Sequence, residues 1–529
     1  MGLFISIFDL PFLPPIVLLP LLLSLTLILI ILPLYRLYMH PLSHIPGPPL
    51  WIISRLPFAY NLVLGRLPYT ISSIHAKYGP VVRLAPNEIS FITEEAWDDI
   101  YTVQKGMDGR RIQMQKDPLL FLRPEEGSFD MLFEYDDKEH ARHRRIFSHA
   151  FSNRTLREQE PIIQQHISKM VGKLSEVCDK RVDMSAWFNY VLFDTVGDLV
   201  VGETFDCLET QSLHPWAKTF FSFAKGITIM GMTQRFWPLT PILMFFVPEE
   251  MQEAETELRV FTKDRVEARL AKTDAKKDII SHIKPHLFPL PSTQTITPTE
   301  LYHNTQILVV GGSETTATTL SGALYFLLSN PRTLTLLTHE LRTLFPTSDS
   351  ITLSSIRSAP HLTAVLHETF RLFSPFAGLL RRITPKEGCV SSGVYVPGNT
   401  TVAVNSYAAS HSGGNFHDAE MFVPERWLEP RDPATVYPDG YDEDSFMGDR
   451  KGVVRPFGVG PRNCVGMKLG RAVLALVAAR LVWGFDFEFV DVEEGGRWME
   501  GVEVYVWYER PPLMCRLKPR GKGGNAVDG

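Results

Sequence analysis

The chain has 529 residues, of which 45% are apolar and 21% are charged, and its formal net charge is −6. These proportions are typical of a globular protein with a substantial core, in which disorder is confined to short pieces. The slight negative charge, without a long basic stripe, argues against nucleic acid as the main partner.

The first residues predict a membrane anchor. Residues 10–35 contain no charged side chain, and Ile16 to Leu32 is almost entirely Leu, Ile and Val, which is long enough to cross a bilayer, more easily a thin one such as that of the endoplasmic reticulum. Five prolines interrupt this run, although proline is tolerated better in membrane helices than elsewhere. A cleaved signal peptide is the alternative, but no basic segment precedes the run and no A-x-A-like site follows it.

The charges that flank this run predict its orientation. Arg36 and His40 follow it and Asp9 precedes it, so the positive-inside tendency places the large C-terminal part in the cytosol. We therefore predict an N-terminal anchor in residues 1–40, with a span of about 12–35, and one large domain in residues 41–529. The expected location is the endoplasmic reticulum membrane, with a single pass.

Past the anchor, the elements predict a mainly α domain with small β-sheets. Residues 40–49 are too rich in proline for a helix, and Val81–Leu84 with Glu88–Phe91 predict a β-hairpin. From about residue 134 to 330 the apolar period is mostly helical, including a charged amphipathic segment at 250–278, and a polar loop spans 286–297. No internal repeat or long linker divides the chain after residue 50.

The best-marked helix begins at Thr297-Pro298-Thr299-Glu300, a capping box with proline at the first helical position, and ends at Asn330-Pro331. In its middle stands Gly311-Gly312-Ser313-Glu314-Thr315-Thr316. Each of these glycines costs a helix about 1 kcal/mol relative to alanine. Close approach of a ligand is one explanation for them, and a helix–helix contact through small residues is the other.

Two further stretches carry paired polar residues. Residues 360–373 predict a short helix with Glu368 and Arg371 on one face, a spacing that by itself is usually surface decoration. Strand-like pieces at 379–383 and 401–405 follow, and then a loop with Pro424-Glu425-Arg426-Trp427.

Near the C-terminus, Phe457-Gly458-Val459-Gly460-Pro461-Arg462-Asn463-Cys464-Val465-Gly466 precedes an apolar helical segment, Met467 to Trp483. This order places the Cys464 thiol at a helix N-terminus, where unpaired backbone N–H groups favour a thiolate. A buried structural cysteine is the alternative. The other four cysteines are widely spaced, so neither a disulfide framework nor a C-x-x-C metal site is expected.

Together these motifs resemble the cytochrome P-450 family of haem-thiolate monooxygenases. The cysteine stretch fits the signature F-x-x-G-x-R-x-C-x-G, residues 311–316 match the oxygen-activation motif, and Glu368-x-x-Arg371 with Arg426 matches the family's Glu-Arg-Arg network. Their order and separation agree with the family over about residues 41–517. Stretches such as residues 77–83 and 156–161 resemble fungal members of secondary metabolism, particularly the isotrichodermin-hydroxylase type.

The resemblance implies a role for each of these residues. Cys464 would be the ligand of haem b iron, and Phe457 would pack beside it and limit water around the sulfur. Thr315 and Glu314 would deliver protons during oxygen activation. Gly311 stands where the family often has alanine, and Glu368, Arg371 and Arg426 would be structural.

Cationic residues are expected to bind the haem propionates, because the guanidinium fork suits carboxylates. By resemblance these are Arg462, Arg382 and Arg144, with His140 in place of the family's tryptophan. Surface salt bridges are the alternative role for these arginines.

The resemblance predicts a catalytic domain in residues 41–529 that inserts one oxygen atom from O2 into an apolar small molecule. Electrons would come from NADPH through a reductase, since no nucleotide-binding motif occurs in the chain, and Arg142 and Arg145 would help to dock that partner. Two alternatives remain: a haem-thiolate isomerase, dehydratase or ring-coupling oxidase, and a non-catalytic haem carrier or sensor.

The substrate itself is not predicted, and polyketide, terpenoid and alkaloid scaffolds all suit the composition. The expected contact regions are residues 105–127, 205–237 and 374–380 and the first half of the long helix, which are apolar with few charges.

Overall fold

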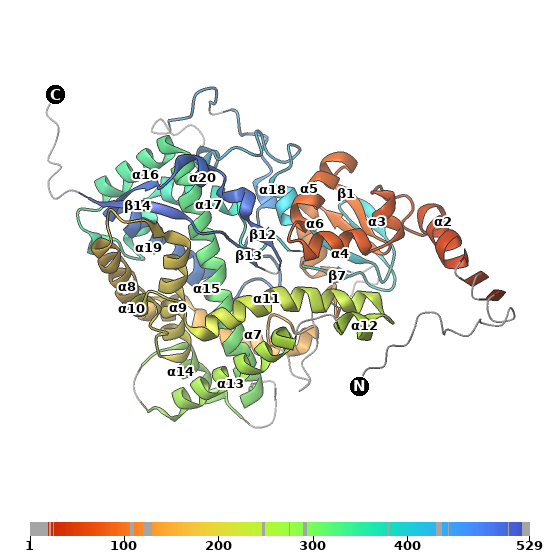
Figure 1. Cartoon of the computed structure of the whole chain (residues 1–529), viewed down its shortest axis with the longest axis horizontal. Helices are drawn as coiled ribbons and strands as arrows, with labels where there is room; N and C mark the ends of the chain where they lie inside the picture. The colour runs from red at the N-terminus through yellow and green to blue at the C-terminus, as the bar shows by residue number, and fades with distance from the viewer. Residues whose placement is uncertain are drawn as a thin grey trace, which may run out of the picture.

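The structure is a computed structural model, and it describes residues 19–20, 23–24, 26–105, 111–119, 130–245, 249–273, 276–288, 292, 294–378, 380–429, 436–442, 444–505 and 507–520. Helices make up most of the described chain, and small sheets lie at the N-terminal and C-terminal sides (Figure 1). The prediction of a mainly α fold with small β-sheets is therefore confirmed.

The described helices range from the 3-residue α2 to the 32-residue α15. They are α2 Leu32–Leu34, α3 Pro49–Ile53, α4 Leu56–Val63, α5 Leu67–Tyr78, α6 Glu95–Tyr101, α7 Asp137–Ser148, α8 Asn153–Glu176, α9 Met184–Val201, α10 Cys207–Thr210, α11 Pro215–Thr233, α12 Thr240–Met244, α13 Glu249–Ala271, α14 Ile279–Ile283, α15 Pro298–Ser329, α16 Pro331–Leu344, α17 Pro360–Leu372, α18 Ser406–Ser410, α19 Met467–Gly484 and α20 Val492–Gly496.

The strands are short, and they are β1 Val81–Ala85, β2 Glu88–Phe91, β3 Gln104–Lys105, β4 Arg111–Ile112, β5 Gln115–Lys116, β6 Val182–Asp183, β7 Arg382–Ile383, β8 Cys389–Ser391, β9 Val394–Val396, β10 Thr401–Val404, β11 Phe485–Phe489, β12 Glu503–Val504, β13 Tyr508–Glu509 and β14 Met514–Pro519. The largest sheet has the order β1-β2-β10-β7-β5. The predicted hairpin is its β1–β2 pair, and β10 joins β2 in parallel. This sheet brings residues from both ends of the chain together.

Only part of the predicted membrane span lies in the described residues, because residues 1–18, 21, 22 and 25 fall outside them. The described chain from Leu27 to Met39 is helical, with π-helical turns at Leu27–Ile31 and Tyr35–Met39 on either side of α2. Figure 1 shows α2 projecting from the body beside α3. Among the described helices, none combines the length and the apolarity needed to cross a bilayer.

The long helix α15 crosses the body of the molecule (Figure 1). Its predicted start is confirmed, since the Thr297 side chain accepts from the Glu300 N–H and the Glu300 side chain accepts from the Thr297 N–H. Its predicted end at Asn330 is also confirmed, although the Asn330 side chain bonds back to Phe326 and does not cap α16. Ala317 and Leu320 of α15 share one apolar core with α9, α17 and α19.

Candidate functional site

The loop before α19 has a shape that depends on glycine. The Cys464 N–H donates to the Phe457 carbonyl at 2.8 Å, and Gly458 and Gly460 have φ angles of 67° and 75°. A Cβ on Gly460 would lie 2.1 Å from the Tyr101 carbonyl oxygen, so only glycine fits there. The loop delivers Cys464 to the N-terminal side of α19, as predicted.

Cys464 is exposed at the end of the loop that precedes α19. The protein around the thiol raises its pKa by desolvation, whereas the Gly466 N–H and the Arg144 charge act in the opposite sense. Arg144 itself donates to the backbone oxygen of Asn463 and, at 2.7 Å, to its Oδ1. Arg144 therefore braces the loop that carries the cysteine. A thiol in this setting becomes a thiolate when it coordinates a metal cation.

Phe457 packs between two elements beside the loop. Its ring meets Phe370 of α17 edge to face, with ring centroids 5.5 Å apart, and the Arg471 guanidinium lies 5.2 Å from its centroid. A Cβ on Gly470 would lie 3.6 Å from the Phe457 ring. The ring therefore closes one side of the cysteine loop against α17 and α19.

The two glycines of α15 have different surroundings. A Cβ on Gly312 would lie 3.2 Å from a Val196 methyl group of α9, whereas a Cβ built on Gly311 would have no described atom within 4 Å apart from its chain neighbours and the backbone of α15. Gly312 is thus explained by helix packing, and Gly311 leaves space beside the helix. The Thr315 hydroxyl donates to the Gly311 carbonyl at 2.6 Å, so it lies next to that space.

Glu314 is buried and is held by a residue that sequence reasoning missed. Arg510, in the segment after β13, donates from one terminal nitrogen to both Glu314 oxygens at 2.9 and 3.0 Å. Burial raises the Glu314 pKa to about 6, against the lowering effects of Arg510 and of the Thr318 hydroxyl. The carboxyl group can therefore gain or lose a proton near neutral pH. Arg510 lies in no recognisable motif, so the sequence offered no signal for it.

A group of buried cations gathers beside the cysteine loop. In the β5–β7 pair, Lys116 lies directly opposite Arg382, and both side chains are buried. Burial lowers the Lys116 pKa to about 7, and Arg382 and Arg462 lower it further, while Asp130 and Glu134 oppose them. Like charges directly opposite in a sheet are destabilising. This arrangement is suited to an anion that lies between them, and Lys116 is a second residue that sequence reasoning missed.

The other residues that were predicted to bind the haem propionates lie beside these buried cations. Arg462 pairs with Asp137 of α7 at 2.7 Å and also donates to backbone oxygens of the segment before α7. Burial lowers the His140 pKa to about 3, and the charges of Arg462, Lys116 and Arg144 contribute to the shift, so His140 is neutral. Burial also lowers the Arg382 pKa to about 10, and among the described residues no carboxylate lies within ion-pair distance of it.

Arg142 has a different role from the one expected. It is buried and pairs with Glu300 at the start of α15 and with Glu139. The prediction that Arg142 helps to dock a partner protein is wrong, because its guanidinium fastens α7 to α15. Arg145 lies on the exposed face of α7.

The Glu-Arg-Arg network is a buried structural unit, and not surface decoration. Glu368 accepts from Arg371 at 2.7 and 2.8 Å, from Arg426 at 3.0 Å and from the Trp427 indole at 2.8 Å. Arg371 and Arg426 are fully enclosed and also bond to backbone carbonyls of the 410–421 region. This network fixes α17 to the segment that leads into the cysteine loop.

Comparisons with known proteins identify the family. The family model of cytochrome P450 matches residues 45–514. The chain is 36% identical over 487 residues to cytochrome P450 monooxygenase astA of Talaromyces wortmannii, covering 92% of this chain and 94% of that protein. It is 37% identical to monooxygenase lcsI of Purpureocillium lilacinum, with coverages of 92% and 91%, and 36% identical to averantin hydroxylase of Dothistroma septosporum, with coverages of 92% and 88%.

The chain therefore belongs to the cytochrome P450 family. It is a cytochrome P450 monooxygenase, as predicted. The family implies haem iron as the cofactor, and the residues present fit that group: Cys464 is an accessible thiol, and the buried Lys116–Arg382 pair is suited to the two haem carboxylates. The non-catalytic carrier alternative finds no support.

Proposed function

We propose that Cys464, as thiolate, binds haem iron and that this chain hydroxylates or epoxidises an apolar small molecule with O2. The observation that carries the proposal is the buried, directly opposed Lys116–Arg382 pair next to the cysteine loop. When bound, haem supplies oxygen activation, for which a thiolate ligand is well suited. Lys116, Arg382 and Arg462 would bind its propionates, and neutral His140 would donate a hydrogen bond.

The cysteine loop would set the properties of the sulfur. The Phe457 ring excludes water on one side of the loop, and the Gly466 N–H stabilises negative charge on Cys464. Arg144 holds Asn463 and so fixes the loop and adds positive charge nearby. These groups would keep the thiolate deprotonated and oriented.

The spectrum of the purified protein tests this proposal most directly. After reduction and exposure to carbon monoxide, we expect the Soret band at the wavelength from which the family takes its name, because only a thiolate ligand produces it. A folded, haem-containing protein without that band would contradict the role of Cys464. Product formation without NADPH would instead favour an isomerase or dehydratase.

On the other side of the site, Thr315 and Glu314 would handle protons. The Thr315 hydroxyl lies beside the space left by Gly311, and Glu314 has a pKa of about 6, so the pair can relay protons from the protein to the reacting oxygen. The relay would run from the Glu314 carboxyl, which contacts Thr318 and Arg510, to the Thr315 Oγ1.

The variant Thr315→Ala is expected to keep the thiolate band and to keep consuming NADPH, while product formed per NADPH falls about tenfold and peroxide rises. The control is Thr316→Ala, since the Thr316 hydroxyl bonds to Gly312 at 2.8 Å on the buried, α9-facing side. Product and peroxide are measured together by chromatography and a peroxidase assay. Tight coupling in Thr315→Ala would remove Thr315 from the relay.

We also propose that electrons come from NADPH through a flavoprotein reductase that docks beside the cysteine loop. Arg145 of α7 and Lys468 in the first turn of α19 are exposed basic residues near that loop. Such residues attract an acidic partner and raise its rate of association. In this proposal Arg145 and Lys468 form the docking surface, and Arg142, which is buried, takes no part in it.

The double variant Arg145→Glu/Lys468→Glu is expected to raise the KM for reductase about tenfold or more at low salt, with a smaller difference at high salt. Lys77→Glu, an exposed charge reversal on α5, is the matched control. The rate of haem reduction is measured by stopped flow over a range of reductase concentrations, for the double variant and for the control. An unchanged KM in the double variant would place the docking surface elsewhere.

The proposed location is the endoplasmic reticulum membrane, with the catalytic domain in the cytosol. Support comes from the apolar run of residues 16–32 and from exposed apolar side chains on the helical segment that continues it and on neighbouring surfaces, namely Leu27, Ile28, Leu50, Leu56, Tyr60, Trp237, Ile242 and Phe245. Recovery of the full chain in the microsomal pellet after a high-salt wash tests this location. Release into the supernatant would argue against a membrane anchor.

A further inference from the structure

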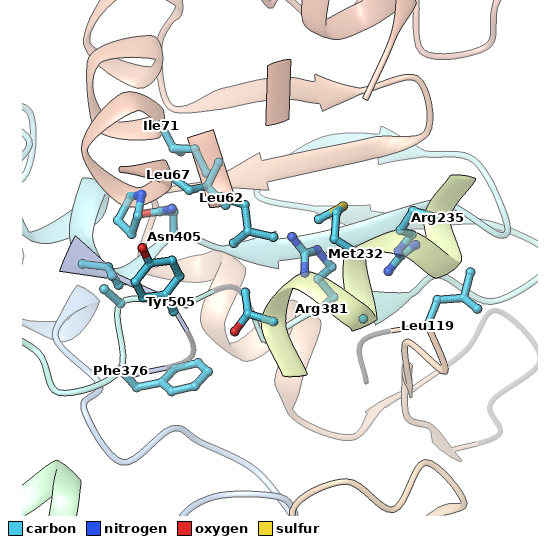
Figure 2. A pocket seen from close by; sticks show the side chains of 16 residues that line it. Leu62, Leu67, Ile71, Leu119, Met232, Arg235, Phe376, Arg381, Asn405 and Tyr505 are labelled. Carbon is cyan, nitrogen blue, oxygen red and sulfur yellow. The ribbon is translucent and has the colours of Figure 1, made fainter. Parts of the chain in front are cut away.

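A pocket of about 80 Å³ lies between α5, α11, the segment that follows α17 and the β12–β13 hairpin. It joins three of the regions from which substrate contacts were predicted: Leu119, Met232 and Phe376 represent them (Figure 2). Most of its wall is apolar. Figure 2 shows Arg235 and Arg381 toward one end and Asn405 and Tyr505 toward the other. We call it the arginine pocket.

The arginines around the arginine pocket outnumber the carboxylates that pair with them. Glu88 pairs with both Arg55, at 2.5 Å, and Arg381, at 2.7 Å. Asp117 pairs with Arg235. Three guanidinium groups thus share two carboxylates, and all five side chains are nearly or fully buried. The cluster keeps an excess of one positive charge.

The donors of these arginines are only partly used. Arg381 gives its Nε hydrogen to Glu88, and its terminal nitrogens make no hydrogen bond to any described residue. Arg235 donates from one terminal nitrogen to Asp117, and no other bond of its guanidinium is found in the described part of the chain. Both residues line the arginine pocket, so donors remain for a ligand there.

Asn405 adds an unpartnered donor to the same pocket. Its side-chain oxygen caps α18 by accepting from the Ala408 N–H at 2.7 Å, so its Nδ2 is the free end. Asn405 is only 1% exposed, and its buried Nδ2 has no hydrogen-bond partner among the described residues. A buried donor without a partner is costly and is usually matched by a ligand or water.

No Asp or Glu is among the described residues that line the arginine pocket, so its wall supplies no carboxylate to accept hydrogen bonds from these donors. A ligand that complements it must bring acceptor oxygens and negative charge on an apolar body. We propose that the arginine pocket binds the acidic end of the substrate, an anionic oxygen of a carboxylate or of an ionised phenol, through Arg381, Arg235 and Asn405.

The sheet connects this pocket to the oxidation site. Arg382, the first residue of β7, lies opposite Lys116, and Arg381, which directly precedes β7, lines the arginine pocket. The small volume suits one end of a molecule and not a whole substrate. This inference rests on the proposed function, because it assigns the pocket to the substrate of that site, and it predicts that the oxidised carbon lies remote from the acidic group.

The experiment measures binding, and not turnover, on the purified holoenzyme by calorimetry. Two matched probe pairs are used: naphthoate with naphthamide, and dinitrophenolate with dinitroanisole. At least one anion is expected to bind about tenfold or more tightly than its neutral partner, and the pair that discriminates tells a carboxylate site from a phenolate site. Equal affinities within both pairs would overturn the proposal.

The variant Asn405→Asp keeps the oxygen that caps α18 and turns the free donor into a negative oxygen. It is expected to weaken the preferred anion about 10- to 100-fold and to leave the neutral partner unchanged. Asn399→Asp makes the same substitution at an exposed position two residues before β10 and should change neither affinity. Equal losses for anion and neutral partner, or equal losses in both variants, would overturn the assignment.

Arg381→Gln tests the same point without an added charge, and Arg55 continues to pair with Glu88 in that variant. Selective loss of anion affinity is expected there too, and an unchanged preference for the anion would count against the proposal. Failure of the proposed function is distinguishable, because it appears as a missing thiolate band, whereas these affinities are measured without reduction or turnover.

Discussion

The variant Glu368→Ala is expected to yield no folded, haem-loaded protein. Its carboxylate lies between Arg371 and Arg426, and all three side chains are fully enclosed. Burial alone would raise the Glu368 pKa, but the two arginines outweigh it and hold the pKa below its usual value. Among the described residues, removing the carboxylate leaves the buried Arg371 without an ion-pair partner and leaves Arg426 with Asp449 alone, at a cost of about 3–5 kcal/mol. That cost is a large part of the stability of a typical domain.

The matched control is Glu158→Ala on α8, which removes a partly exposed carboxylate that pairs with Arg154 and Lys277. We expect that variant to leave the stability nearly unchanged, because ion pairs at the surface contribute little. Haem content per chain and the midpoint of thermal unfolding are compared for both variants. Wild-type haem content in Glu368→Ala would show that the network is dispensable.

The second large effect is expected at Glu314. The variant Glu314→Gln should keep the thiolate band and slow product formation about 10²- to 10⁴-fold, which is the usual contribution of a general acid or base. Glutamine preserves the size of the side chain and its contact with Thr318, but it carries no transferable proton. Single-turnover rates measure the effect, and a rate within threefold of wild type would exclude Glu314 from proton delivery.

Arg510 gives this second prediction a pH dependence. Burial raises the Glu314 pKa to about 6 while Arg510 lowers it, so Arg510→Met should raise the pKa further. Glu314 then stays protonated to higher pH, and the limb of the rate profile that reports its ionisation should move to higher pH. The raised Glu314 pKa also makes the stability of the protein depend on pH. A carboxyl with a raised folded-state pKa stabilises the protein below pH 4.5 and loses that contribution as the pH rises through about 6.

Local chemistry explains which elements were predictable from the sequence. The capping box at Thr297 and the hairpin at 81–91 depend on neighbours in the chain, and both form as expected. The cysteine loop was predictable because Gly458 and Gly460 mark conformations that other residues do not adopt. These signals lie within a few residues of the structure that they predict.

The residues that sequence reasoning missed depend on distant partners. Lys116 matters because β5 lies beside β7, and Arg510 because its segment folds back onto α15. Arg142 was assigned wrongly for the same reason: its position on α7 looked like a basic surface, whereas Glu300 is 158 residues away in sequence and adjacent in space. No periodicity records such pairs, so they follow only from the tertiary structure.

The parallel pairing of β2 with β10 has a consequence for the biosynthesis of the enzyme. It joins segments more than 300 residues apart, and β7, which carries Arg382, is held in the sheet through β10. Pairings between such distant segments form late in folding, because a large loop must close first. During synthesis the N-terminal strands must therefore wait for most of the chain to leave the ribosome. We expect cofactor capture to follow chain completion, because β10 and Cys464 both lie in the last third of the chain.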